Sequence, residues 1–240
     1  MASHVRNSVK QIDGDSWLIG EKLVLHKKQS AQEWLWRDSN DGCYYSIAEA
    51  PTPLPITIPL QSNSYVRLVH DAGDALAVWS FGDAFLKVKL VQDRTAATRE
   101  HVTLRWLAGR KLSFAIPNAL HHTEEADRSH LFVSRVPGRS VADAWRGLSE
   151  HEKEHCVVCV GEICEELSAW GSDAMTGVDG AQLPESFLDM FHNPHDFRPE
   201  TLQENCSQLG MGCDTFVFCH CDLGPYNIMV DRGGSVGVID

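Results

Sequence analysis

Hydrophobic and polar residues alternate in three short runs in the second quarter of the chain, as expected for β-strands that bury one face. The runs occupy residues 64–70, 76–81 and 84–90, and short turns that contain Gly73 and Gly82 separate them. Strands joined by such short turns pair in antiparallel fashion. The pattern therefore predicts a three-stranded antiparallel meander.

Helical spacing follows the meander. Residues 95–110 predict one helix, and residues 149–170 predict a second, longer one. Ser149, with Glu152 three residues later, is the capping-box sequence that begins a helix. Apolar residues of the second helix recur at steps of four and three and so share one face. These residues are Cys156, Val160, Ile163, Leu167 and Trp170.

The chain before the meander has a different pattern. Clusters of Trp, Leu and Ile indicate some packed structure, and no internal repeat is found. Residues 50–60 contain four prolines and cannot hold a helix. We therefore interpret residues 1–60 as an N-terminal extension that ends in a linker.

The last 25 residues carry the clearest chemical signal. An apolar run leads to His220 and Asp222, Asn227 follows five residues later, and a predicted strand–turn–strand hairpin ends on Asp240. Phosphoryl transfer needs a carboxylate that orients the acceptor hydroxyl, together with oxygen ligands for Mg²⁺. The spacing D-x-x-x-x-N, followed by Asp at a strand end, is the arrangement of kinase catalytic segments. Asp222 is thus the predicted catalytic residue, and Asn227 and Asp240 are the predicted metal ligands.

The same segment, HCDLGPYNIMVD followed by GVID, resembles the H-G-D-L-x-x-x-N-I-L-V and G-V-I-D motifs of the aminoglycoside phosphotransferase and choline kinase-like family. It is most similar to the fungal members described only as phosphotransferase-family proteins. The resemblance implies an α+β, protein-kinase-like fold with two lobes: a β-rich nucleotide-binding small lobe at residues 61–136 and a helical large lobe at 137–240. The large lobe is expected to be incomplete, because family members continue beyond the position of Asp240 with helices that build much of the acceptor pocket.

Two further residues of the segment are interpreted through this resemblance. Cys221 stands where many members have Gly, and a small side chain still fits there. In the family, the histidine before the catalytic Asp braces the loop by hydrogen bonding to the backbone, which is the role expected of His220.

The resemblance also implies a nucleotide site in the small lobe. Lys87 would hold the α- and β-phosphates of ATP, and Glu100 on the following helix would pair with Lys87. Lys89 shares a strand face with Lys87, so pattern alone does not separate the two, and either lysine could instead be a solubilising residue of an edge strand. At the hinge, Ser134 and Val136 would offer backbone groups to adenine.

Three other patterns have competing interpretations. Residues 151–155, HEKEH, match the zinc-protease signature, but they fall in the exposed first turn of a capped helix, where acidic residues are favoured without metal. Cys156 and Cys159 form a C-x-x-C pair inside an amphipathic helix, which favours structural thiols over a redox or metal pair. The turn at residues 70–75 has one glycine, and either a phosphate-covering loop or an ordinary hairpin turn would explain it.

Composition narrows the classes of function. The chain has 240 residues and a formal net charge of −12, which argues against nonspecific nucleic-acid binding. No apolar run reaches membrane-spanning length, and no secretory signal is recognised. Eight cysteines without a signal sequence indicate reduced thiols and a cytoplasmic location.

The expected reaction is transfer of the γ-phosphoryl group of ATP, with Mg²⁺, to a hydroxyl of a small-molecule acceptor, without a nucleic-acid or membrane partner. The main alternative is a catalytically inactive, truncated kinase-like protein that binds a nucleotide or another protein.

Overall fold

The computed structural model describes residues 4–30, 32–61, 64–91, 97–125, 127–185, 187–189 and 196–239. The chain divides into two compact units. The first comprises Met1–Arg94 and Asn118–Arg135, and the second comprises Thr95–Pro117 and Val136–Asp240. Each unit has a hydrophobic core of its own.

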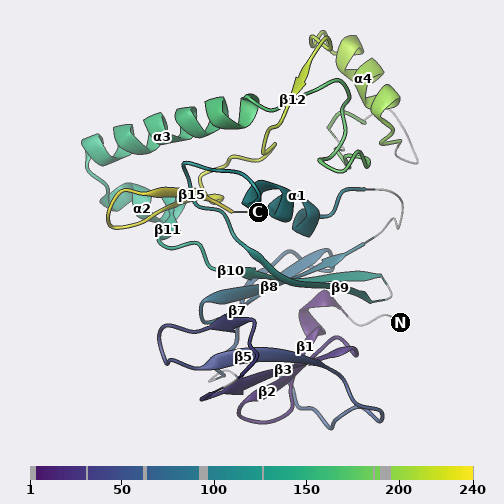
Figure 1. Ribbon diagram of the computed structural model, residues 1–240, viewed down its shortest axis with the longest axis vertical. Coiled ribbons are helices and arrows are strands. Elements are labelled where there is room, and N and C mark those ends of the chain that lie inside the picture. Colours follow the sequence, from purple (N-terminus) through teal and green to yellow (C-terminus); the bar gives the residue numbers. More distant parts are fainter. Residues whose placement is uncertain are drawn as a thin grey trace. The chain divides into compact units, whose positions relative to one another are not determined.

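The first unit consists of two five-stranded antiparallel sheets, which lie one above the other in Figure 1. One sheet follows the short helix η1 (Val5–Asn7) and has the order β1-β2-β3-β5-β4. Its strands are β1 (Val9–Gln11), β2 (Ser16–Ile19), β3 (Leu23–Lys28), β4 (Trp36–Arg37) and β5 (Tyr44–Glu49).

The second sheet of this unit has the order β6-β7-β8-β10-β9. Its strands are β6 (Arg67–Asp71), β7 (Leu76–Phe81), β8 (Ala84–Leu90), β9 (Ala119–Glu125) and β10 (Arg128–Ser134). The antiparallel pairing of β6 with β7 and of β7 with β8 confirms the predicted meander. Since β8 also pairs with β10, it is the central strand of the sheet.

Both sheets contribute to one aromatic core. Trp36 from the first sheet stacks on Tyr45 at 4.7 Å between ring centroids, and its ring lies 5.7 Å from Phe132 of the second sheet. The Trp36 indole N–H also donates to the Phe81 carbonyl oxygen at 3.3 Å. Trp17 packs edge-on against Phe81 at 5.9 Å. Strands before residue 50 therefore share a core with strands after residue 66. The domain limits at residues 60 and 136 are not tested by these contacts and stay predictions.

The second unit is built from helices and short strands. Its helices are α1 (Glu100–Ala108), α2 (Val141–Ala144), η2 (Trp145–Gly147), α3 (Glu150–Ser168) and α4 (Pro199–Gln208). Its strands are β11 (Arg139–Ser140), β12 (Gly171–Ser172), β13 (Phe216–Val217), β14 (Ile228–Val230) and β15 (Val236–Val238). They form a three-stranded sheet, β11-β14-β15, and a two-stranded sheet, β12-β13. Among the described residues, no helix is both long and apolar enough to cross a membrane.

Helix α3 begins and packs as its sequence predicts. Glu152 N–H donates to the Ser149 hydroxyl at 3.3 Å, and Ser149 N–H donates to the Glu152 carboxylate at 2.7 Å, which completes the capping box. Of the predicted apolar face, Cys156, Ile163 and Leu167 are buried, and the remaining positions are partly buried in the same core.

Candidate active site

The chain enters the candidate catalytic loop from an aromatic cluster. Phe218 N–H donates to the Trp170 carbonyl oxygen at 2.9 Å, and the Phe218 ring stacks on Trp106 at 5.3 Å. Trp170 packs edge-on against both rings. The cluster joins α1, the end of α3 and the segment after β13, and so fixes the point where the loop begins.

Asp222 and Asn227 lie in direct contact within this loop. The Asn227 side-chain amide donates to the Asp222 carboxylate at 3.0 Å and to the Asp222 backbone carbonyl at 2.9 Å. Asn227 N–H donates to the Gly224 carbonyl at 2.9 Å, which closes the turn between them. Because the amide nitrogen is used at Asp222, the amide oxygen of Asn227 is the atom left for a cation.

The hairpin after the loop returns the chain to Asn227. Strands β14 and β15 pair from Ile228↔Val238 to Val230↔Val236, which confirms the predicted hairpin. Ile239 N–H then donates to the Asn227 carbonyl at 2.9 Å. Asp240 lies outside the described residues, so its place as a metal ligand stays a prediction, but the residue directly before it is bonded to Asn227.

Two features of the loop differ from what its sequence indicates. Both ring nitrogens of His220 are buried without a hydrogen-bond partner in the part of the chain that the structure describes, so the expected bond to the backbone is not formed there. Cys221 has φ of 64°, the left-handed region that favours glycine. This conformation gives a physical reason for the glycine that many family members have at this position.

A support of the loop that the sequence did not reveal comes from α2. Ala142 N–H donates to the Pro225 carbonyl oxygen at 2.9 Å. A backbone group of any residue type can make this bond, so no sequence signal could have identified it.

In the first unit, Lys87 occupies the middle of β8, between Val78 on β7 and Leu131 on β10. It is half-buried, whereas Lys89 two residues further is exposed. Since β8 is central, neither lysine lies on an edge strand. Glu100 is the first residue of α1 in the second unit, and its pairing with Lys87 stays a prediction.

The hinge residues differ in which backbone groups they can offer. Ser134 N–H donates to the Asn118 carbonyl at 3.0 Å, and Arg135 N–H donates to the Asp83 carbonyl at 2.8 Å. Of its two backbone groups, Ser134 could therefore offer adenine only the carbonyl oxygen. Val136 N–H makes no backbone hydrogen bond among the described residues, which leaves it open as a donor.

The contacts of the turn between β6 and β7 favour an ordinary hairpin. Ala72 N–H donates to the Leu76 carbonyl at 2.9 Å. The amide of Gly73 donates to the Asp71 carboxylate at 3.1 Å, and Asp74 contacts the His4 ring. Two carboxylates on the turn would repel a phosphate.

The H-E-x-x-H and C-x-x-C patterns on α3 have structural partners. His155 Nε2–H donates to the Gly234 carbonyl at 3.1 Å and thereby ties α3 to the hairpin turn. Burial raises the pKa of both Cys156 and Cys159, which makes them poor thiolates. These contacts fit the interpretation of the two patterns as structural.

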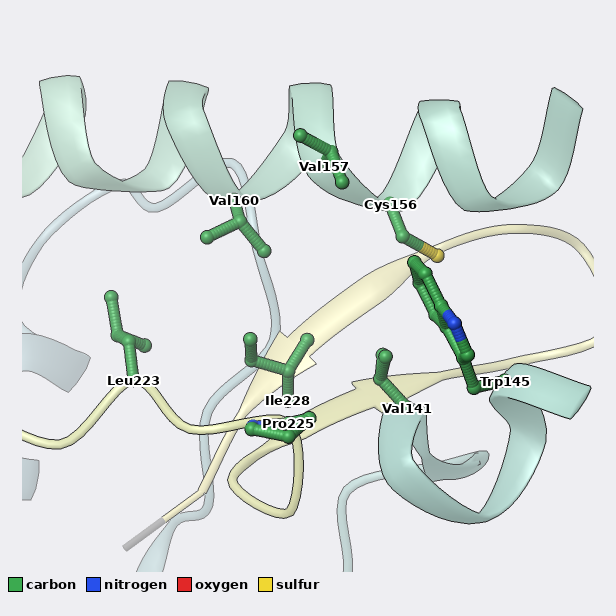
Figure 2. Close-up of a pocket in the computed structure, with 8 residues that line it drawn as sticks. All are labelled: Val141, Trp145, Cys156, Val157, Val160, Leu223, Pro225 and Ile228. Carbon is green, nitrogen blue, oxygen red and sulfur yellow. The ribbon is translucent and has the colours of Figure 1, made fainter. Parts of the chain in front are cut away.

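An apolar pocket of about 210 Å³ lies beside the loop in the second unit. Figure 2 shows Cys156, Val157 and Val160 reaching into it from α3, while Leu223, Pro225 and Ile228 face them from the loop and β14. Val141 and Trp145 complete the lining. These side chains offer little to orient a hydroxyl group, so the pocket alone does not make an acceptor site.

The chain is a mixed α+β protein in which Asp222 and Asn227 contact each other, at the D-x-x-x-x-N spacing found in kinase catalytic segments. The chain matches the sequence profile of the phosphotransferase enzyme family (APH) over residues 61–240, three quarters of its length, and it belongs to that family. The expectations of this family and of an α+β, kinase-like fold class are thus confirmed.

Comparison with solved structures finds chains of the bifunctional kinase-methyltransferase WbdD. One is 18% identical, with 77% of this chain and 34% of that chain covered and a TM-score of 0.38. Monomeric WbdD is 16% identical, with 89% of this chain and 42% of that chain covered and a TM-score of 0.38. The chain thus spans less than half the length of these structures. A search of curated proteins finds no significant match.

Proposed function

We propose that the protein transfers the γ-phosphoryl group of ATP to a hydroxyl of a small-molecule acceptor. The observation that carries the proposal is the contact between the Asn227 amide and the Asp222 carboxylate, in a chain that belongs to a phosphotransferase family. We further propose that it acts in the cytoplasm, without a nucleic-acid or membrane partner.

Asp222 is the proposed catalytic residue. Its side chain is exposed, so an acceptor hydroxyl can approach it. The Asn227 amide holds one carboxylate oxygen and leaves the other to accept the proton of the hydroxyl. Fixing the carboxylate in this way lowers the cost of orienting it during the reaction.

The donor set fits magnesium. Asn227 and Asp240 would hold the ion with an amide and a carboxylate oxygen, the hard ligands that Mg²⁺ prefers. The bond from Ile239 N–H to the Asn227 carbonyl supports the proposal, because it brings the chain directly before Asp240 to Asn227. When bound, magnesium neutralises phosphate charge.

Lys87 is the proposed phosphate ligand and Glu100 its partner. Both lysines lie on the central strand β8, but Lys87 is half-buried and Lys89 is exposed. This difference supports Lys87, because a partly buried side chain has less conformational freedom to lose on binding. For adenine, the open N–H of Val136 and the carbonyl of Ser134 are the proposed contacts.

The proposal is tested by thermal unfolding with ATP and magnesium, separately and together. Magnesium-dependent ATP binding at one hundred times Kd adds about 2.7 kcal/mol of stability. Asp240→Ala should abolish this gain, and Asp173→Ala, which changes an exposed aspartate of the same unit, should retain it.

Asp222→Asn should retain the ATP-dependent stabilisation but lose turnover in a screen of hydroxyl acceptors. A parent chain that ATP and magnesium do not stabilise would contradict the proposal. Stabilisation without turnover on any acceptor would instead favour the inactive nucleotide-binding alternative.

A further inference from the structure

Two cysteine sulfurs lie together directly before the proposed catalytic aspartate. Cys219 Sγ and Cys221 Sγ are 3.2 Å apart. Both residues are exposed overall, although neighbouring atoms partly shield each sulfur from water. They flank His220, and Asp222 follows Cys221 in the chain. Neither thiol has a role in the phosphoryl transfer proposed above.

A local bend of the backbone brings these sulfurs together. In an extended strand, residues two positions apart are separated by about 6.6 Å. Here the left-handed conformation of Cys221, with φ of 64°, turns the chain back. The Cys221 sulfur consequently lies 3.8 Å from the Cys219 carbonyl oxygen. The closeness of the thiols is therefore built into the loop.

The two thiols differ in their readiness to react. Hydrogen bonding from the Cys221 thiol stabilises the Cys219 thiolate and lowers the pKa of Cys219 to about 6, although burial and the nearby Glu185 carboxylate oppose the shift. The same contact with Cys219, together with burial, raises the pKa of Cys221. At neutral pH Cys219 is thus the thiol that would attack a disulfide first, and Cys221 is the thiol that would attack second.

We propose that Cys219 and Cys221 form a reversible disulfide, which makes the loop before Asp222 a site of redox modification. A disulfide has an S–S distance of about 2.05 Å, so the sulfurs must approach by roughly 1.2 Å. The oxidant is a low-molecular-weight disulfide such as oxidised glutathione. Transient disulfides of this kind occur in otherwise reducing compartments.

The chemistry balances over two exchange steps. The Cys219 thiolate attacks one sulfur of the small disulfide, forms a mixed disulfide and releases one small thiolate. The Cys221 thiol then loses its proton to solvent and attacks the Cys219 sulfur, which releases the second small thiolate. Two protein thiols are oxidised, and one small disulfide is reduced to two thiols.

Disulfide formation alters the position of Asp222, because closing the ring changes the backbone at the adjoining residue Cys221. A displacement of about 1 Å at a reacting group costs about a hundredfold in rate. The oxidised protein should therefore transfer phosphate about a hundredfold more slowly, and this consequence rests on the proposed function. The disulfide itself does not depend on that function.

The first test is peptide mapping of the full chain after incubation in glutathione buffers of increasing oxidised fraction. A protease that cleaves before aspartate releases residues 214–221, which contain Cys219 and Cys221 and no other cysteine. After oxidation and alkylation, this peptide should have lost two hydrogens and carry no alkyl group. Dithiothreitol should restore two alkylation sites.

Variants test the assigned order of attack. Cys221→Ser should accumulate a glutathione adduct on Cys219, because the second thiol is missing, and Cys164→Ser, at an exposed cysteine of α3, should behave as the parent. A parent peptide that stays doubly alkylated at every buffer ratio would overturn the proposal. So would a stable glutathione adduct that never closes to the disulfide.

The activity arm compares oxidised with reduced rates within each variant. The parent and Cys164→Ser should lose activity on oxidation and recover it with dithiothreitol, while Cys219→Ser should be insensitive. An equal loss in Cys219→Ser, or an active oxidised parent, would overturn the link to Asp222. If the reduced parent transfers no phosphate, the proposed function fails, and the peptide masses still decide whether the disulfide forms.

Discussion

At the scale of single residues, the contact of Asn227 with Asp222 gives each side chain a separate use. The amide nitrogen faces the carboxylate, and this leaves the amide oxygen for a cation and one carboxylate oxygen for a hydroxyl. A side chain without an N–H donor at position 227 would remove the hydrogen bond to the Asp222 carboxylate.

Asn227→Asp is expected to lower phosphoryl transfer by at least about tenfold. The variant keeps the shape of the side chain but replaces a donated hydrogen bond with a second negative charge beside Asp222, and buried or closely placed like charges resist ionisation. Steady-state kinetics with ATP and an accepted substrate measures the effect. Asn7→Asp, at an exposed position of η1 that takes no part in the proposed site, is the control, and equal rates in both variants would contradict the assignment.

His130 on β10 makes stability depend on pH. Its side chain is 1% exposed, its ring nitrogens have no hydrogen-bond partner among the described residues, and burial lowers its pKa from 6.5 to about 4. The unfolded chain therefore binds a proton at a higher pH than the folded chain does. Stability should be complete above pH 6.5 and fall as the pH drops toward 4, by about 3 kcal/mol at most for a shift of this size.

His130→Leu should remove this part of the pH dependence and leave neutral-pH stability equal or higher, because two unsatisfied buried nitrogens are lost. Urea unfolding between pH 4 and 7 measures the change, with the exposed His70→Leu as the control. A parent-like pH profile in His130→Leu would refute the explanation.

At the scale of elements, the capping box at the start of α3 is a local interaction, and its loss should lower the free energy of unfolding of the protein. Ser149→Ala removes the hydroxyl that accepts from Glu152 N–H and should cost about 1 kcal/mol. The contacts with Ser149 lower the pKa of Glu152, so their stabilisation is present above the ordinary glutamate range and is lost on acidification through the lowered pKa. Chemical unfolding at neutral pH is the measurement. Ser168→Ala at the other end of α3 should cost less, and an equal loss would argue against the cap.

Elements with a local signal could be predicted from the sequence. The meander, the start and buried face of α3, and the β14–β15 hairpin follow from alternation, capping residues and turn residues, and the structure has all of them. The closeness of Asp222 and Asn227 also follows from the sequence, because only four loop residues separate them, while their catalytic and metal-binding roles stay proposals.

Features that depend on distant contacts could not be predicted. The position of β8 in the middle of its sheet depends on pairing with β10, some forty residues away. The bond from Ala142 to Pro225 uses only backbone groups, and the left-handed conformation of Cys221 contradicts its residue type. In each case the deciding interaction lies outside the local sequence window.

At the scale of the whole molecule, strands from the first 50 residues are part of the hydrophobic core of the first unit. Trp17, Trp36 and Tyr45 from the first sheet cover Phe81 and Phe132 of the second. A shortened chain that holds only residues 61–240, the part matched by the family profile, would lack these three side chains and would expose this aromatic surface to water.

A shortened chain that begins at residue 61 should therefore aggregate or unfold without cooperativity. The milder change Trp17→Ala should cost about 3–5 kcal/mol in the full chain, since the indole is fully buried. Solubility and thermal unfolding measure both effects. A soluble, cooperatively unfolding chain from residue 61 would show that the second sheet does not need the first.

The separation of the tryptophans between the two cores offers a spectroscopic consequence. Trp17, Trp36 and Trp79 are buried in the first unit, whereas Trp106 and Trp170 belong to the second, where the Arg110 guanidinium lies 3.0 Å from the Trp106 ring centroid. Replacing every tryptophan of one unit with phenylalanine, including the exposed Trp34 in the first unit or Trp145 in the second, leaves an emission signal that reports on the other unit alone. Fluorescence melting curves from the two resulting proteins would then reveal whether the units lose their structure together or one after the other.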